Sequence, residues 1–153
     1  MSRSAVFAAI GLGAILLSTF AYAEQAKYGT AEEARAMLDK VIAAITADKT
    51  KALDMFNKGE GGFKDRDLQP FCFNISDGIL TASTNPKLLG KDVRSLKDKT
   101  GKAFGEENFK AAVVGKVTEV SYMFPRPGET EPTAKTSFVT GIGDQGCGVG
   151  YYK

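Results

Sequence analysis

The side chains that most often carry out chemistry in proteins are scarce in this 153-residue sequence. It contains no histidine and only two cysteines, Cys72 and Cys147, which lie far apart. Without histidine there is no Ser-His or Cys-His nucleophile pair, and the commonest general base near neutral pH is absent. Two distant cysteines are also too few for a thiolate zinc site or an iron–sulfur cluster. Composition therefore argues against most enzyme classes, and neither a metal nor another cofactor is expected.

Two carboxylate pairs, Asp65/Asp67 and Glu106/Glu107, remain as candidates for acid–base catalysis. Neighbours along a strand or helix face different ways, so neither pair is arranged to act on one bond. Asp65 and Asp67 also lack the downstream ligands of a calcium loop. Since nothing marks a nucleophile, the protein is not expected to be an enzyme.

The first residues have the pattern of an export signal. Arg3 precedes an apolar run at residues 5–17, and Ala21-Tyr22-Ala23 matches the small-residue pattern that signal peptidase accepts. This predicts a signal peptide over residues 1–23 and a mature domain over residues 24–153. The apolar run is shorter than the roughly 20 residues of a membrane span, although an uncleaved anchor is the alternative. We therefore expect a periplasmic or secreted protein that is soluble after signal cleavage.

The mature chain has the size and composition of one soluble globular domain. Hydrophobic residues make up 43% of the sequence and charged residues 25%, and the net charge is only +2. A nearly neutral chain gives no reason to expect a nucleic-acid partner. In an oxidising compartment, two cysteines and no others suggest one disulfide, with two free thiols as the alternative.

The pattern of apolar residues predicts helices first and strands later. Thr30 and Glu33 form a capping box before a helix over residues 31–47, and Asp48 can cap a second short helix that ends at Gly59. Alternating residues predict a hairpin of strands, a helical excursion follows, and three more strands close the chain. The predicted strands are 68–75, 79–83, 118–124, 134–142 and 147–152, and the excursion includes a helix over 106–114. This order describes an α+β domain built on an antiparallel sheet.

Several short segments resemble an extracellular Cache domain of the single-domain type. The resemblance extends from about residue 30 to residue 153, and six segments carry it in the right order. They are Asp67-Leu68-Gln69-Pro70-Phe71-Cys72-Phe73-Asn74, then Asp77-Gly78, then Asn85-Pro86 with Gly90-Lys91, then Tyr122-Met123-Phe124-Pro125, then Lys135-Thr136-Ser137-Phe138-Val139, and finally Cys147-Gly148-Val149-Gly150-Tyr151-Tyr152.

The resemblance implies a PAS-like fold, in which a long N-terminal helix precedes a five-stranded antiparallel sheet. Such domains are usually the external sensing parts of chemoreceptors and histidine kinases, and they bind carboxylates or amino acids over the sheet. Two features depart from the pattern: Phe124 stands where relatives often carry tryptophan, and no signalling module follows Lys153. The expected partners are therefore a small organic ligand, a separate membrane-bound receptor or kinase, and a second copy of the chain.

The implied fold also places the first and last strands side by side, which suits a bond between Cys72 and Cys147. If these cysteines share one face, Gly148 and Gly150 share the opposite face with Phe71 and Phe73. The glycines leave volume above the sheet, which either a small ligand or a closely packed helix could fill.

Five residues are the expected ligand-binding set. Pocket specificity comes from a few polar groups in an apolar wall. Tyr122 offers a hydroxyl donor, Lys135 a positive charge for a carboxylate, and Ser137 a further hydroxyl. The alternatives are a core tyrosine and a solvated strand lysine, and Arg126 is expected to be exposed in a Pro-Gly turn. The complete set is Phe73, Tyr122, Phe124, Lys135 and Ser137.

The leading hypothesis is an exported sensing or binding module for a small carboxylate or amino acid. It would act with a separate membrane signalling partner. The alternative is an accessory protein that keeps the Cache fold without a working pocket.

Overall fold

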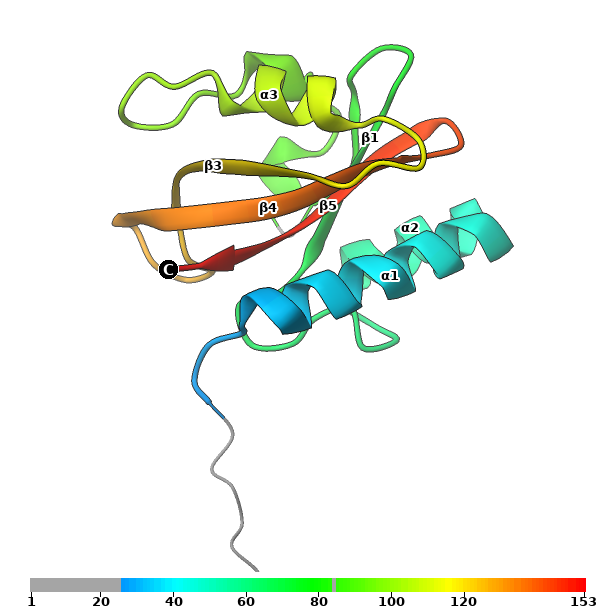
Figure 1. Cartoon of the computed structure of the whole chain (residues 1–153), viewed down its shortest axis with the longest axis horizontal. Helices are drawn as coiled ribbons and strands as arrows, with labels where there is room; N and C mark the ends of the chain where they lie inside the picture. The colour runs from blue at the N-terminus through cyan, green and yellow to red at the C-terminus, as the bar shows by residue number, and fades with distance from the viewer. Residues whose placement is uncertain (1–25, 84) are drawn as a thin grey trace, which may run out of the picture.

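The computed structural model describes residues 26–83 and 85–153, so the predicted signal peptide at residues 1–23 lies outside the described part. In these residues, five strands form one antiparallel sheet. Three α-helices and two short 3₁₀ segments cover its two faces (Figure 1). This confirms the predicted α+β, PAS-like architecture. Within the described ranges, no helix is both long and apolar enough to cross a membrane. The elements are α1 (Ala31–Ala47), α2 (Lys49–Lys58), β1 (Pro70–Asn74), β2 (Leu80–Ala82), η1 (Pro86–Leu88), η2 (Val93–Ser95), α3 (Phe104–Ala111), β3 (Thr118–Pro125), β4 (Pro132–Ile142) and β5 (Gln145–Tyr152).

The first helix begins where its capping box predicts. The backbone N–H of Glu33 donates to Thr30 Oγ1 at 3.2 Å, and the N–H of Thr30 donates to the Glu33 carboxylate at 2.8 Å. Asp48 ends α1 and caps α2 by accepting from the N–H of Lys51 at 3.0 Å. Gly59 ends α2 with φ +68°, a conformation that glycine adopts at little cost. Both predicted N-terminal helices are therefore confirmed.

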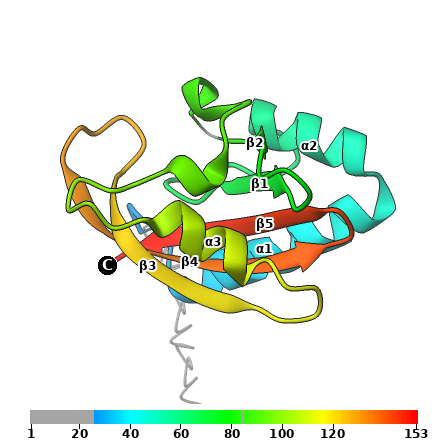
Figure 2. The same cartoon turned by 90° about the horizontal axis from the view of Figure 1, so that it is seen from above.

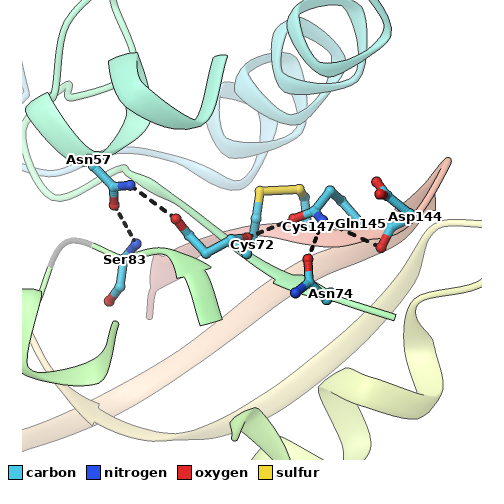
Figure 3. The surroundings of a disulfide bond; sticks show 8 residues. Asn57, Cys72, Asn74, Ser83, Asp144, Gln145 and Cys147 are labelled. Carbon is cyan, nitrogen blue, oxygen red and sulfur yellow. Dashed lines mark hydrogen bonds between the residues drawn. A yellow bond between two sulfur atoms is a disulfide. The ribbon is translucent and has the colours of Figure 1, made fainter. Parts of the chain in front are cut away.

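The last strand lies at the centre of the sheet, whose strand order is β2-β1-β5-β4-β3. In the pairing of β1 with β5, Cys72 stands directly opposite Cys147, and the two are joined in a disulfide with Cα atoms 4.1 Å apart. Figure 3 shows this bond beside Asn57 of α2, whose side-chain amide binds Thr81 O and the N–H of Ser83. The disulfide fastens the centre of the sheet, while Asn57 ties α2 to the edge strand β2.

The main hydrophobic core lies between the sheet and the N-terminal helices. Leu38 and Val41 of α1 are fully buried there together with Leu68, the disulfide and Val149. Burial of apolar side chains on this scale is the principal force that holds α1 against the sheet. Figure 1 shows α1 and α2 together on this side.

The opposite face of the sheet is covered by α3 and by the segment that contains η1 and η2. Figure 2 shows α3 over β3 and β4. Gly105, in the first turn of α3, approaches η2 so closely that a β-carbon there would overlap the carbonyl of Val93. This close approach holds α3 against η2, and the helix spans Phe104–Ala111, so it begins two residues and ends three residues earlier than the sequence predicts. The packing on this face leaves a cavity toward the ends of β1, β3 and β5.

Candidate functional site

A cavity of about 440 Å³ lies on the face of the sheet that α3 partly covers. Its walls come from all five strands, from α3, from the segment that contains η1 and η2, and from the turn after β3. Five aromatic rings form much of the surface: Phe71, Phe104, Tyr122, Phe124 and Tyr152. The volume is within the usual range for a small-molecule site, and so is the mixture of apolar wall with a few polar groups.

Three of the five expected ligand-binding residues line this cavity, namely Tyr122, Phe124 and Lys135. Phe73 and Ser137 are fully buried and are not part of its wall. Phe73 instead packs beneath α3, where its ring centroid is 5.9 Å from that of Phe109. Ser137 lies behind Tyr122 and shares a hydrogen bond of 2.9 Å with the Tyr122 hydroxyl.

The space above the β5 glycines is filled by side chains of the neighbouring strands, and not by a ligand. Phe73 covers Gly146, Phe71 covers Gly148, and a β-carbon at either glycine would overlap the ring. Helix packing contributes only at Gly146, where Ala112 also approaches. The cavity therefore lies beside these glycines, with Phe71 in its wall.

Lys135 crosses β5 over Gly150, where a β-carbon would overlap its Cε atom. This route brings the ammonium group to 4.8 Å from the centre of the Tyr152 ring and 5.3 Å from that of Phe124. Its Nζ also donates to the Tyr152 hydroxyl at 3.4 Å. Burial lowers the pKa of Lys135 to about 8, and the negative charge of Asp67 opposes that decrease. The ammonium group of Lys135 therefore lies in a corner formed by Phe124 and Tyr152, where it is partly desolvated and can pair with an anion.

Tyr122 lies on β3 directly beside Lys135 of β4 and also lines the cavity. Its ring stacks on Phe104 at a centroid distance of 4.2 Å with an interplanar angle of 8°. Burial raises the pKa of Tyr122 to about 12, although hydrogen bonding to Ser137 and Asn108 opposes the increase. The hydroxyl therefore stays protonated at neutral pH and can act as a hydrogen-bond donor.

Four charged residues of the cavity wall were not expected from the sequence, namely Lys64, Asp67, Arg126 and Glu129, and two of them are largely buried. Arg126 is buried, with only 15% of its side chain exposed, and Asp67 is more deeply buried at 6%. The Arg126 guanidinium lies between the rings of Tyr28 and Tyr152, 4.2 and 4.9 Å from their centres. Arg126 does lie at the predicted turn, where its carbonyl accepts from the N–H of Glu129, but the prediction that it is exposed is wrong. β3 continues through Pro125, which pairs with Pro132. This extension carries Arg126 along the wall of the cavity.

Three buried side-chain atoms have no hydrogen-bond partner among the described residues: Asp67 Oδ2, Asn108 Oδ1 and Arg126 Nε. All three residues line the cavity. Asp67 Oδ2 and Arg126 Nε face each other at 3.5 Å, close enough for ionic attraction but without a hydrogen bond. Buried polar atoms in folded proteins almost always have partners, so a polar molecule in the cavity would complete this site.

The charges on the cavity wall favour an anion. Three cations, Lys64, Arg126 and Lys135, stand against two carboxylates, Asp67 and Glu129. A site of this kind can bind and orient a small anion. Within residues 26–83 and 85–153, no group of three or more acidic, cysteine or histidine side chains is placed to hold a metal.

Comparison with known protein families settles the family. The model of the Cache domain matches residues 14–152, nearly the whole sequence. The chain is a Cache domain. The expected resemblance is therefore confirmed, and the Cache family consists of sensory domains. Among curated proteins, no relative matches this Cache domain.

Solved structures show the same fold. A methyl-accepting chemotaxis protein from Vibrio parahaemolyticus RIMD 2210633 matches with a TM-score of 0.62 and 21% identity, covering 79% of this chain and 86% of its own. A Cache chemosensory domain described with a structural basis for carboxylic acid recognition matches with a TM-score of 0.58 and 25% identity, covering 79% and 86%. The periplasmic sensor domain of a chemotaxis protein matches with a TM-score of 0.59 and 24% identity, covering 79% and 88%. This Cache domain therefore has the architecture of chemoreceptor sensor domains.

Proposed function

We propose that this Cache domain is an exported sensing module that binds a small carboxylate or amino acid without chemical conversion. The observation that carries the proposal is the position of Lys135, whose ammonium group lies in an aromatic corner of the cavity. A carboxylate there would gain a charge-assisted hydrogen bond in a site that excludes most water. Arg126 supplies a second donor, since its Nε has no hydrogen-bond partner among the described residues.

The cavity volume of about 440 Å³ limits the ligand to a small molecule, and the rest of the wall favours one with both apolar and polar parts. The aromatic rings suit a short apolar portion, while Tyr122 and Asn108 can hydrogen-bond to a hydroxyl or amino group. Carboxylic acid recognition is reported for one Cache domain that is 25% identical to this one, which supports the same ligand class. A carboxylate that pairs with Lys135 therefore fits both the shape and the charge of the cavity.

The first test is thermal unfolding of the mature protein in the presence of small carboxylates, amino acids, purines and amines. A ligand at about 100 times its dissociation constant stabilises the folded state by roughly 2.7 kcal/mol, which raises the melting temperature by several degrees. Carboxylates or amino acids should give this shift, and purines and amines should not. A flat panel would contradict the proposal and favour an accessory protein without a working pocket.

The site assignment is tested with Lys135→Met, which keeps most of the side-chain volume and removes the charge. This variant should lose at least about tenfold in affinity for a carboxylate, because one charge-assisted hydrogen bond contributes about 1.5–3 kcal/mol. Lys116→Met is the matched control, since Lys116 is exposed and is not part of the cavity. Equal affinities in both variants would remove Lys135 from the site.

The proposal includes export and a separate membrane partner. Residues 1–23 are proposed to be cleaved, so the N-terminus of the exported protein should be Glu24. The ligand-bound domain is proposed to contact a membrane-bound receptor or kinase, which ligand-dependent cross-linking in membranes would capture. An exported protein with Met1 at its N-terminus would contradict cleavage. Cross-linking that is the same with and without ligand would contradict the ligand-dependent contact with a membrane partner.

A further inference from the structure

Residues 26–30, which lead into α1, pack against the wall of the cavity. Tyr28 covers the guanidinium of Arg126 at 4.2 Å. The backbone N–H of Gly29 donates to Asp67 Oδ1 at 2.7 Å. A β-carbon at Gly29 would overlap the side chain of Leu68, so the backbone itself approaches the segment just before β1 closely here. The entrance to α1 and the candidate ligand site therefore share one wall.

Asp67 lies between the entrance to α1 and the cavity, in contact with Gly29 on one side and Arg126 on the other. One of its oxygens binds the Gly29 N–H, and the other faces Arg126 Nε at 3.5 Å without a hydrogen bond. The carboxylate is almost fully buried, so it cannot turn to water when its surroundings change. A shift of Arg126 would therefore change the surroundings of one carboxylate oxygen while the other binds Gly29.

Arg126 can respond to a ligand because its own contacts are incomplete. Its guanidinium lies between Tyr28 and Tyr152, and its Nη1 reaches Thr133 Oγ1 only at 3.5 Å. A carboxylate in the cavity offers its Nε a full hydrogen bond, which the present contact with Asp67 does not. An anion would thus compete with Asp67 and Tyr28 for the same guanidinium.

We propose that Asp67 is a positioning residue that couples Arg126 in the cavity to the backbone at Tyr28 and Gly29, so that ligand occupancy changes the segment entering α1. This inference rests on the proposed function, because it assigns the route by which the same site reports its occupancy. The segment concerned leads directly into the helix that covers the other face of the sheet (Figures 1 and 2). In this arrangement Arg126 contacts the ligand in the cavity, and Asp67 connects Arg126 to the backbone at the start of α1.

The coupling is measured first without ligand, through hydrogen exchange at the Gly29 amide. Arg126→Gln should speed this exchange about threefold or more, because it removes both the stacking on Tyr28 and the charge facing Asp67. Arg126→Lys keeps the charge but not the planar stack, so its Gly29 exchange rate should lie between those of the original chain and Arg126→Gln. It replaces the glutamine variant if that variant fails to fold. The Thr30 amide, which binds Glu33, reports helix capping separately.

A double-mutant cycle then separates coupling from a merely structural role. Asp67→Asn keeps an acceptor for the Gly29 N–H and removes the charge that faces Arg126. In that background, Arg126→Gln should change Gly29 exchange much less than it does alone. Lys116→Met, at an exposed position outside the cavity, is the control and should leave Gly29 exchange unchanged. Additive effects in the cycle, or equal acceleration by Lys116→Met, would overturn the proposal.

Sodium acetate and L-alanine serve as ligand probes in the second arm. Where either stabilises the protein, Gly29 exchange should change in the original chain and stay constant in Asp67→Asn. Stabilisation without any change at Gly29 would overturn the coupling while leaving the binding function intact. If neither probe stabilises the protein, the ligand class fails for these probes, and the ligand-free cycle still decides the coupling.

Discussion

Lys135 reaches the cavity only because residue 150 on the neighbouring strand is glycine. Its Cε lies where a β-carbon of residue 150 would stand, and its aliphatic stem crosses β5 at that point. In the register of the sheet, Lys135 pairs with Tyr152 and Gly150 with Ser137, so the lysine runs diagonally over the glycine. A missing side chain on one strand thus determines where a charge on the next strand is placed.

Substituting Gly150→Ala should therefore weaken ligand binding without touching a binding residue. The new methyl group displaces Lys135, and we expect at least about tenfold loss in affinity for a carboxylate. The free energy of unfolding should also fall by about 1–3 kcal/mol from overpacking. Calorimetric titration and denaturant unfolding measure the two effects.

Gly146→Ala is the matched control on the same strand and the same face. Its methyl group would overlap Phe73 and Ala112, neither of which lines the cavity. We expect comparable destabilisation with affinity near that of the original chain. Equal loss of affinity in both variants would mean that Gly150 acts through stability alone.

Ligand affinity should depend on pH through Lys135. Its folded-state pKa is about 8 because burial disfavours the ammonium form. A carboxylate binds best while this group is protonated, so affinity should be level below about pH 7 and fall as the pH rises through about 8. Titrations at several pH values would show this decline, and Lys135→Met should abolish it. A flat profile in the original chain would contradict the pairing.

The same pKa has the opposite consequence for the ligand-free fold. Lys135 has an ordinary pKa of 10.5 in the unfolded chain and about 8 when folded. Between these values the unfolded chain binds more protons, so the contribution of Lys135 to stability rises with pH across that window. Comparing the pH dependence of unfolding in the original chain and in Lys135→Met isolates this contribution. A difference that decreases from pH 8 to 10 would be contrary to a buried ammonium group.

Removing the hydroxyl of Tyr122 should cost little stability. Tyr122→Phe keeps the stack on Phe104 and loses the hydrogen bond to Ser137, for an expected loss of about 0.5–1.5 kcal/mol. Tyr122→Ala should lose about 3–5 kcal/mol, because it also empties buried volume. Urea unfolding measures both, and similar losses would indicate that the stack contributes little.

Reduction of the disulfide should require unfolding. Cys72 and Cys147 are both fully buried, so a reductant reaches them only when the sheet opens. Replacing both by alanine should destabilise the domain by up to roughly 4–5 kcal/mol on the chain-entropy model. Alkylation followed by intact-mass measurement, with and without urea, checks the first expectation. Rapid alkylation after reduction in native buffer would contradict it.

The sequence predicts the fold well because its signals there are local. The capping box at Thr30 and Glu33 and the left-handed Gly59 mark the bounds of α1 and α2 without help from the rest of the chain. The long strands are predicted in the right places, but β4 and β5 each begin two residues earlier than the sequence predicts. The disulfide follows because only two cysteines exist and the implied topology places their strands side by side.

The site is less predictable because it depends on contacts between distant segments. Arg126 has the local sequence of an exposed turn, and it is buried only because Tyr28 and Tyr152 enclose it. In the sequence, Asp67 looks like part of an incomplete calcium loop. Its place in the site becomes evident only from its contacts with Gly29 and Arg126 in the fold. The glycines of β5 suggested room for a ligand or a helix above the sheet, but side chains of β1 and β4 fill it, and which ones do so depends on the register of β1 and β4 against β5.

The central position of β5 has a consequence for the order of folding. The β1–β2 and β3–β4 pairs are each made earlier in the chain, yet both can join a common sheet only through β5, which is synthesised last. The β4–β5 pair is a tight hairpin, but the cysteines that pair β1 with β5 are 75 residues apart, and pairing across such a separation is slow. The sheet therefore cannot be completed before β5 has been made. For the export proposed above, this late completion would favour a chain that is still unfolded when it crosses the membrane, before its disulfide forms.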